Sequence, residues 1–430
     1  MRDRLEAPTP AGSWKPWARE NRLVLVLSLL VQIAAGAAFG HLYDMRIFMA
    51  SGYLVGSGRN PYAAQDSSAV FRNPYFRGIT TVGYPPPWPL LLGLLYRGTF
   101  AVLPSLPIYN LALKIPVIAA NVGLAFLVAD VLKRLGAGAT AARKAWVFLL
   151  LNPFLLYFGT AWGQFDSVVA LLSLSALLLL HSGRRCASAA LLALAVSFKP
   201  TAIPLVLVAL AFLIGKPLRQ GIAYLAVLLG GLLLFCVAPF FVFRWSPAPI
   251  LQGWNAHFTA AGGLSAMTFF PFLAGSSRLP GGWWLLGMVW VPALGAGVLA
   301  LRPGQKSAVE LLKESLALTL VFFLSRTWLS EPNVILVLPL ALILSCLGEL
   351  DAAALTCLWV LPLVFTIFNT SPAQLLFPSL PAAMEKMLEL AGRFSAVRFA
   401  AQTAAAILWL AAGWRVVISC LRKDQRAWAG

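Results

Sequence analysis

Apolar runs recur along almost the whole chain, from residue 23 to residue 419. Each is close to the length of about 20 residues that a helix needs to cross a hydrocarbon core about 30 Å thick. Because that core holds no water, the backbone N–H and C=O groups of a spanning segment must form hydrogen bonds with each other, as they do in a helix. The runs therefore predict an all-α, polytopic transmembrane helical bundle with about 12 spans and no separate soluble domain.

The composition supports a membrane protein and accounts for the basic charge. Hydrophobic residues make up 60% of the 430 positions and charged residues only 11%, which is outside the range of soluble domains. The formal net charge of +18 raises the question of a nucleic-acid partner. Most lysines and arginines, however, lie in short segments between the runs, the pattern that places cytoplasmic loops. The charge thus predicts topology and attraction to anionic membrane lipids, and no nucleic-acid partner.

Basic residues set the expected ends of the membrane domain. The N-terminal segment is rich in arginine and lysine, so residues 1–22 are expected to be a cytoplasmic basic tail. No small-residue cleavage site follows the first apolar run, which predicts a retained span. Residues 23–419 then form the transmembrane domain, and residues 420–430 a second cytoplasmic tail.

The same charge count predicts that the long loops lie outside. The first external loop covers about residues 41–107, and two others cover about 243–280 and 370–397. Within the first loop, residues 87–104 are barely long enough to span and carry Arg97, so we expect an interfacial helix there. Long loops on one side predict that the function is carried out on that side.

Acids are scarce on the predicted outer side, and three of them lie at the outer mouths of spans: Asp44, Asp166 and Glu331. Ionisable groups near membrane depth are costly and usually belong to a pathway or a site. The alternative for each is an interfacial acid that is solvated or paired with arginine. Asp44 has no second acid close to it in the sequence, which argues against a divalent metal. No cofactor is expected, and the five cysteines lack metal-ligand spacing.

Two strings around span ends carry further polar candidates. "LLYFGTAWGQFDSVVALL" (155–172) contains Trp162, Gln164 and Asp166. The amide and the carboxylate are acceptors that suit sugar hydroxyls, whereas Trp162 alone is also typical of a membrane-interface anchor. In "LAVSFKPTAIPLVL" (193–206), Lys199 precedes a proline that breaks the helix, which predicts a tight outer turn. This lysine either neutralises a phosphate or extends to the interface.

A third string, "FFLSRTWLSEPNVILVLP" (322–339), places Arg326, Glu331 and Asn333 in one outer turn. A guanidinium suits a phosphodiester because it can bind two oxygens at once, and Glu331 is alternatively its ion-pair partner. His257 lies in the long external segment around residues 250–272 and is either a substrate contact or a loop histidine without a role. We expect this segment to form a lid, with Gly262 and Gly263 as its hinge.

Taken in order, five strings resemble the GT-C superfamily of integral-membrane glycosyltransferases. They are "GSGRNPY", "GYPPPWPLL", "WGQFDS", "SFKPTAIPLVL" and "RTWLSEPNVILVLP". The most similar members are the dolichyl-phosphate-sugar transferases of lipid-linked oligosaccharide and GPI-anchor assembly, with their prokaryotic homologues. The resemblance implies a polyprenyl-phosphate hexose donor, with mannose as the first candidate for the hexose, and a lipid-linked or glycan acceptor on the extracytoplasmic face. Asp44 matches the family's catalytic base, Lys199 its Phe-Lys element, and Glu331 its His-Glu element, with Ser330 in place of the histidine.

The expected reaction is a single, metal-independent displacement that inverts the anomeric carbon. Asp44 would accept the proton of the acceptor hydroxyl, and Lys199, Arg326 and Arg46 would bind the donor phosphate. Arg46 has two alternative roles, holding Asp44 ionised or facing lipid headgroups. The expected substrate contacts are Tyr84, Trp162, Gln164, Asp166, Glu331, Asn333 and His257.

Two other function classes fit part of the pattern. A secondary transporter or lipid flippase also has about 12 spans, but such proteins place ionisable groups near the midplane and show related halves. The polar candidates here gather at outer turns. A membrane transferase that moves an aminoarabinose or an acyl group is the second alternative. The composition favours a prokaryotic plasma membrane, with the endoplasmic reticulum as the other location.

Overall fold

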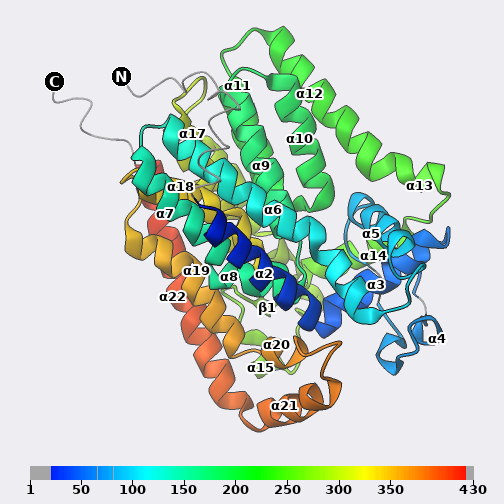
Figure 1. The fold of residues 1–430 in the computed structure, drawn as a ribbon. Helices are drawn as coiled ribbons and strands as arrows, with labels where there is room; N and C mark the ends of the chain where they lie inside the picture. The colour runs from blue at the N-terminus through cyan, green and yellow to red at the C-terminus, as the bar shows by residue number, and fades with distance from the viewer. Residues whose placement is uncertain (1–20, 65, 81, 423–430) are drawn as a thin grey trace.

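The structure, a computed structural model, describes residues 21–64, 66–80 and 82–422. Most of the two expected cytoplasmic tails, 1–22 and 420–430, therefore lies outside the described residues. In the part that is described, nearly every element is a helix, and the two strands have two residues each (Figure 1). The expectation of an all-α helical bundle is confirmed.

Five helical segments are long and apolar enough to cross a membrane. They are Leu106–Arg134 (α6), Gly138–Trp162 (α7, α8 and η3), Leu218–Val242 (α12, η5 and α13), Gly281–Ala300 (η6 and α16) and Ser395–Leu421 (α22). Shorter apolar helices are Arg22–Ala38 (α2), Asp166–His181 (α9), Arg185–Phe198 (α10), Pro200–Leu213 (η4 and α11), Glu331–Cys346 (η7 and α18) and Ala352–Ile367 (α19). The chain is an integral membrane protein, and the count of about 12 spans stays a prediction.

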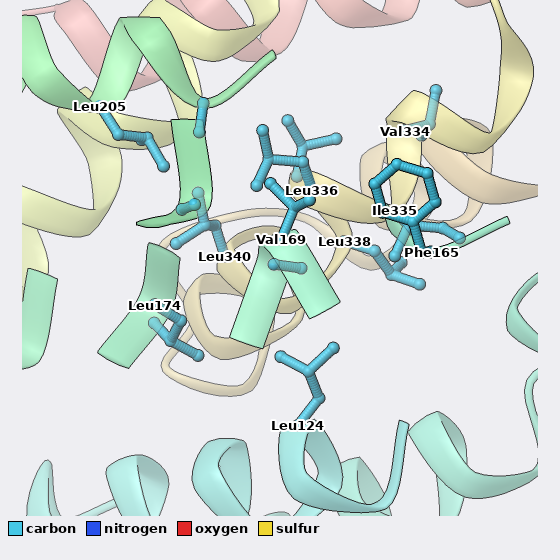
Figure 2. Packing of buried hydrophobic residues seen from close by; sticks show 14 of the residues in the cluster. Leu124, Phe165, Val169, Leu174, Leu205, Val334, Ile335, Leu336, Leu338 and Leu340 are labelled. Carbon is cyan, nitrogen blue, oxygen red and sulfur yellow. The ribbon is translucent and has the colours of Figure 1, made fainter. Parts of the chain in front are cut away.

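The core lies where helices are apolar on all sides. In α18 (Leu338–Cys346), every residue from Leu338 to Leu344 is buried, as expected of a helix without a polar face. Figure 2 shows Leu338 and Leu340 of this helix among residues of other elements, including Leu124 of α6 and Val169 of α9. The core therefore joins the first third of the chain to the last third.

Other apolar helices present their side chains outward. The segment Leu218–Val242 is strongly apolar, yet little of it is buried inside the protein. It extends along one side of the bundle, as α12 and α13 in Figure 1. Because a large exposed apolar surface marks contact with lipid or a partner, and this one has the length of a span, lipid is its expected neighbour.

The segment expected to be the first external loop is largely helical and packs on itself. It contains α3 (Leu42–Gly56), α4 (Ser68–Phe71), η2 (Pro74–Phe76) and α5 (Pro87–Gly98). With 12 residues, α5 is too short to cross the bilayer, in line with the interfacial helix expected at 87–104. α3 and α5 touch closely at Gly93, where an added Cβ would lie 2.3 Å from Val55 Cγ1.

Two predicted chain breaks are confirmed. Helix α10 ends at Phe198, Lys199 is extended, and η4 (Pro200–Ala202) leads into α11 (Ile203–Leu213). This is the turn that a proline imposes. After α17 (Ala308–Leu324), the chain forms β2 (Trp328–Leu329) and η7 (Glu331–Leu336) before α18.

The two strands fix the glycines that were expected to act as a hinge. β1 (Gly262–Gly263) pairs in parallel with β2, with Gly263 opposite Leu329. Gly263 has φ +61, and an added Cβ would lie 2.3 Å from the carbonyl oxygen of Leu329. Glycine is required here for a close backbone approach, so the hinge expected at Gly262 and Gly263 is instead part of a hydrogen-bonded strand. α14 (Ala248–Phe258) and α15 (Phe270–Ala274) flank β1 in the chain. α20 (Ser371–Gln374) and α21 (Pro381–Arg393) lie in the segment expected to be the last external one.

Candidate functional site

Asp44 lies in the first turn of α3 and is held by two aromatic side chains. Trp162 Nε1 donates a hydrogen bond of 2.6 Å to Asp44 Oδ2. His41 Nδ1 lies 3.2 Å from the same oxygen. The His41 and Trp162 rings stack with centroids 3.9 Å apart and an interplanar angle of 9°. The three side chains form one unit, which we call the Asp44 cluster.

The backbone brings this cluster together from two helix ends. His41 precedes α3, and its backbone N–H donates to the carbonyl of Trp162 at 3.2 Å. Trp162 ends the π-helix η3 (Leu156–Trp162), a type that is rare and often found at functional sites. The next residue, Gly163, has φ +100, and a Cβ there would lie 2.4 Å from Met45 Sδ. Only glycine lets the chain turn this close to α3.

The environment of Asp44 keeps its carboxylate charged. Burial alone would raise the pKa of Asp44, but hydrogen bonding with His41, the charge of His41 and hydrogen bonds from Trp162 and Gln164 outweigh it, so the pKa is lowered from 3.8. The side chain is 14% exposed, so it is mostly dry and still reachable. A charged acceptor in such a position suits proton abstraction.

Lys199 and Asp166 bind each other. Lys199 Nζ lies 2.8 Å from both carboxylate oxygens of Asp166, and the two side chains are 8% and 1% exposed. The ammonium is also 5.6 Å from the ring centroids of Tyr84 and Phe165, a distance at which a cation is attracted to a π face. The sequence assigned Lys199 to phosphate and Asp166 to sugar, and the structure brings them together as a buried ion pair.

Tyr84 lies between the Asp44 cluster and this ion pair. Burial raises the pKa of its phenol well above 10.0, and the charges of Asp44 and Asp166 raise it further, while a hydrogen bond with Gln164 lowers it. The phenol is therefore neutral and can donate a proton in a hydrogen bond. The Tyr84 backbone is held by Tyr62, whose hydroxyl donates to its carbonyl at 3.0 Å.

Three expected substrate contacts carry buried oxygens without a partner. In the part of the chain that the structure describes, Glu331 Oε1, Asn333 Oδ1 and Gln164 Oε1 have no hydrogen bond, and each residue is at least nine-tenths buried. Glu331 is close enough to Asp44 for their charges to interact. Asp44 is thus isolated from other acids in the sequence but not in space. Buried acceptors of this kind usually have a donor, which a ligand can supply.

The remaining candidates lie further from Asp44 or contact other groups. Arg46 donates to the carbonyls of Leu42, at 3.0 Å, and Tyr75, at 2.6 Å, and these contacts do not support a role in holding Asp44 ionised. Arg326 Nε donates to the carbonyl of Trp328 at 3.1 Å, and burial lowers the pKa of Arg326 to about 10. No ion pair with Glu331 is formed within the described residues. The side chain of His257 lies outside the description.

His41 is the member of the cluster that sequence reasoning missed. The spacing of "HLYD" carries a signal, because residues three apart at a helix start lie on the same side. The partner Trp162 is 118 residues from Asp44 in the chain, and nothing local indicates that contact.

Comparison with known proteins identifies the fold. No family model and no curated protein sequence matches the chain. The apo crystal structure of ArnT from Cupriavidus metallidurans matches with a TM-score of 0.50 and 13% identity, over 95% of this chain and 78% of that one. The ArnT structure bound to undecaprenyl phosphate matches with a TM-score of 0.49 and 15% identity, over 94% and 77%. The chain therefore has the fold of ArnT, in agreement with the resemblance.

Proposed function

We propose that the chain is a glycosyltransferase that moves a hexose from a polyprenyl-phosphate sugar to a lipid-linked or glycan acceptor. Mannose is the first candidate for this hexose. The observation that carries the proposal is the charged, partly exposed carboxylate of Asp44, held by Trp162 and His41 in a GT-C fold. The reaction takes place on the extracytoplasmic face of a prokaryotic plasma membrane, with both termini cytoplasmic.

Asp44 acts as the general base in this mechanism. The acceptor hydroxyl attacks the anomeric carbon, its proton passes to an oxygen of Asp44, and the bond from that carbon to the phosphate oxygen breaks. A positioned base contributes about 10²–10⁴-fold to the rate. One displacement with one base inverts the anomeric carbon. The hydrogen bond from Trp162 keeps the carboxylate oriented and charged before the proton arrives.

Two cations are available to the departing phosphate. Arg326 uses Nε for the carbonyl of Trp328, which leaves its terminal nitrogens to face two phosphate oxygens. Lys199 has three donor protons, and a phosphate at this ammonium shares it with Asp166. We keep Arg46 as a third, outer phosphate contact, with its side chain already fixed by the first loop.

The unpaired oxygens of Gln164, Glu331 and Asn333 suit the hydroxyl donors of a sugar ring. A site built to accept hydroxyl protons rejects a ligand that lacks them, since its buried oxygens would stay unpaired. Tyr84 supplies a donor in return. His257 stays a proposed contact from the long external segment.

The test is the Asp44→Asn variant, assayed with labelled polyprenyl-phosphate hexose in detergent, where transport has no meaning. Transfer falls by about 10²–10⁴-fold, while donor binding is largely retained. Asp66→Asn is a matched control, because Asp66 is an exposed acid of the same loop that bonds only locally, to the Ser68 N–H. Normal turnover by Asp44→Asn, or a product with retained configuration, refutes the mechanism.

A further inference from the structure

A buried lysine of α6 (Leu106–Arg134) has no place in the mechanism above. Lys114 lies on α6 with an exposed fraction of 0%. Its ammonium donates to the carbonyls of Gly36 at 3.2 Å and Ala161 at 3.0 Å, and also to that of Phe39. In the described ranges, no carboxylate forms an ion pair with it. A buried charge is costly, and here three carbonyl oxygens stabilise it.

These carbonyls belong to the ends of two helices. Gly36 and Phe39 are at the C-terminal end of α2, and Ala161 is in the last turn of η3. The last carbonyls of a helix lack partners within it and carry partial negative charge. An ammonium with three protons satisfies one such oxygen with each. Lys114 therefore holds the ends of α2 and η3 at one point.

The two helix ends lead directly into the Asp44 cluster. Ala161 immediately precedes Trp162, and Phe39 is two residues before His41. The side chains of Trp162 and His41 are the ones that contact Asp44 Oδ2. A shift at either end thus changes the position of a side chain that contacts the base.

Neighbouring residues leave little freedom at this point. Asn110, one turn earlier on α6, donates to the carbonyls of Gly36 at 2.8 Å and Phe39 at 2.7 Å. An added Cβ at Gly163 would lie 3.1 Å from Lys114 Cε. The ammonium, the amide and the tight glycine turn all act on the same stretch of backbone.

We infer that Lys114 is a positioning residue, which fixes His41 and Trp162 against Asp44 by holding the carbonyls that precede them. The inference rests on the proposed function, since it assigns Lys114 to the geometry of the proposed base. It differs from a merely stabilising role, in which Lys114 holds the helices together without affecting Asp44.

The experiment compares Lys114→Met with the full-length wild type in detergent, with rates divided by the amount of folded protein. We expect kcat to fall by about 10²-fold, as a misplacement of about 1 Å produces, with the donor KM within about threefold. The acid limb of the kcat profile should rise by about one pH unit, because Asp44 loses hydrogen bonding to its charged form.

Gln32→Leu is the matched control. Gln32, on α2, bonds with Asn121 of α6 and Thr160 of η3, so it joins the same three elements at a point nearly two turns before the end of α2. We expect this variant to lower the Tm without moving the acid limb. An equal shift of the limb in Gln32→Leu, or an unmoved limb and unchanged kcat in Lys114→Met, overturns the inference.

Asn110→Ala keeps the test decisive if Lys114→Met does not fold. It removes one donor from the same carbonyls and retains the charge of Lys114, so we expect a smaller shift of the acid limb in the same direction. An unmoved limb in a folded Asn110→Ala protein counts against the inference. Absence of transfer by the wild type, or full turnover by Asp44→Asn, instead refutes the proposed function.

Discussion

The hydrogen bond from Trp162 to Asp44 sets how far into acid the proposed base stays charged. Trp162→Phe keeps an aromatic ring for His41, which stacks at 3.9 Å, and removes the N–H that lies 2.6 Å from Asp44 Oδ2. A hydrogen bond to a charged group contributes about 1.5–3 kcal/mol. At about 1.4 kcal/mol per pKa unit, its loss raises the pKa of Asp44 by about 1–2 units.

The sign of the effect on activity follows from the role of the base. Asp44 works when it is ionised, and in the wild type its pKa is below 3.8, so activity persists into acid. In Trp162→Phe the ionised form is lost at higher pH, and the acid limb of kcat moves up with the pKa of Asp44. At pH 7 the base stays ionised, so any loss of rate there reports orientation and not charge.

The assay measures initial rates of sugar transfer in detergent from about pH 3.5 to 8, in steps of about half a unit, with labelled donor in excess so that kcat is observed. Trp409→Phe makes the same chemical change at a buried tryptophan of α22 and controls for general effects on folding. The reasoning fails if the acid limb of Trp162→Phe coincides with that of the wild type. It also fails if Trp409→Phe shifts the limb equally.

Lys199→Met leaves the Asp166 carboxylate, which is 1% exposed, without its partner. We therefore expect the free energy of unfolding, measured in denaturant, to fall by about 3–5 kcal/mol. A loss below about 1 kcal/mol would contradict a buried ion pair. Gly263→Ala places a Cβ 2.3 Å from the Leu329 carbonyl oxygen at φ +61, and we expect it to cost about 1–3 kcal/mol, seen as a lower Tm; an unchanged Tm would argue against the strand pairing. Arg326→Lys keeps the charge but cannot bind two oxygens in parallel, so the donor KM should rise roughly tenfold, about 1.4 kcal/mol. An unchanged donor KM in Arg326→Lys would exclude Arg326 from the phosphate site.

Features governed by local rules were predictable from the sequence. The break between α10 and α11 follows from Pro200 alone, because proline removes a helix hydrogen bond. The short helix α5 was expected from its length and from Arg97. The ordered motifs implied a GT-C fold, and the structural match to the fold of ArnT agrees with it. Each of these depends on neighbouring residues or on the order of strings along the chain.

Contacts between distant segments could not be predicted in the same way. The partner of Lys199 was expected to be a phosphate, whereas Asp166, 33 residues earlier, occupies its ammonium. Trp162 had a plausible role as an interface anchor, and its bond to Asp44 depends on how η3 meets α3. Lys114 gave a signal, since a lysine inside an apolar span is rare, but its carbonyl partners come from α2 and η3.

The pairing of Lys199 with Asp166 bears on how an anionic donor can enter this site. The charges of Asp44 and Asp166 both act on Tyr84, and Glu331 is close enough to Asp44 for their charges to interact. Unpaired carboxylates so close together would repel a phosphate. Because Lys199 neutralises Asp166, this pair adds little net charge to the repulsion. In the proposed mechanism, Arg326 then supplies the charge that attracts the phosphate. Lys199 would therefore favour binding of the donor by neutralising the charge of Asp166 as well as by contacting the phosphate. Its positive charge then acts through a partner that the sequence did not indicate.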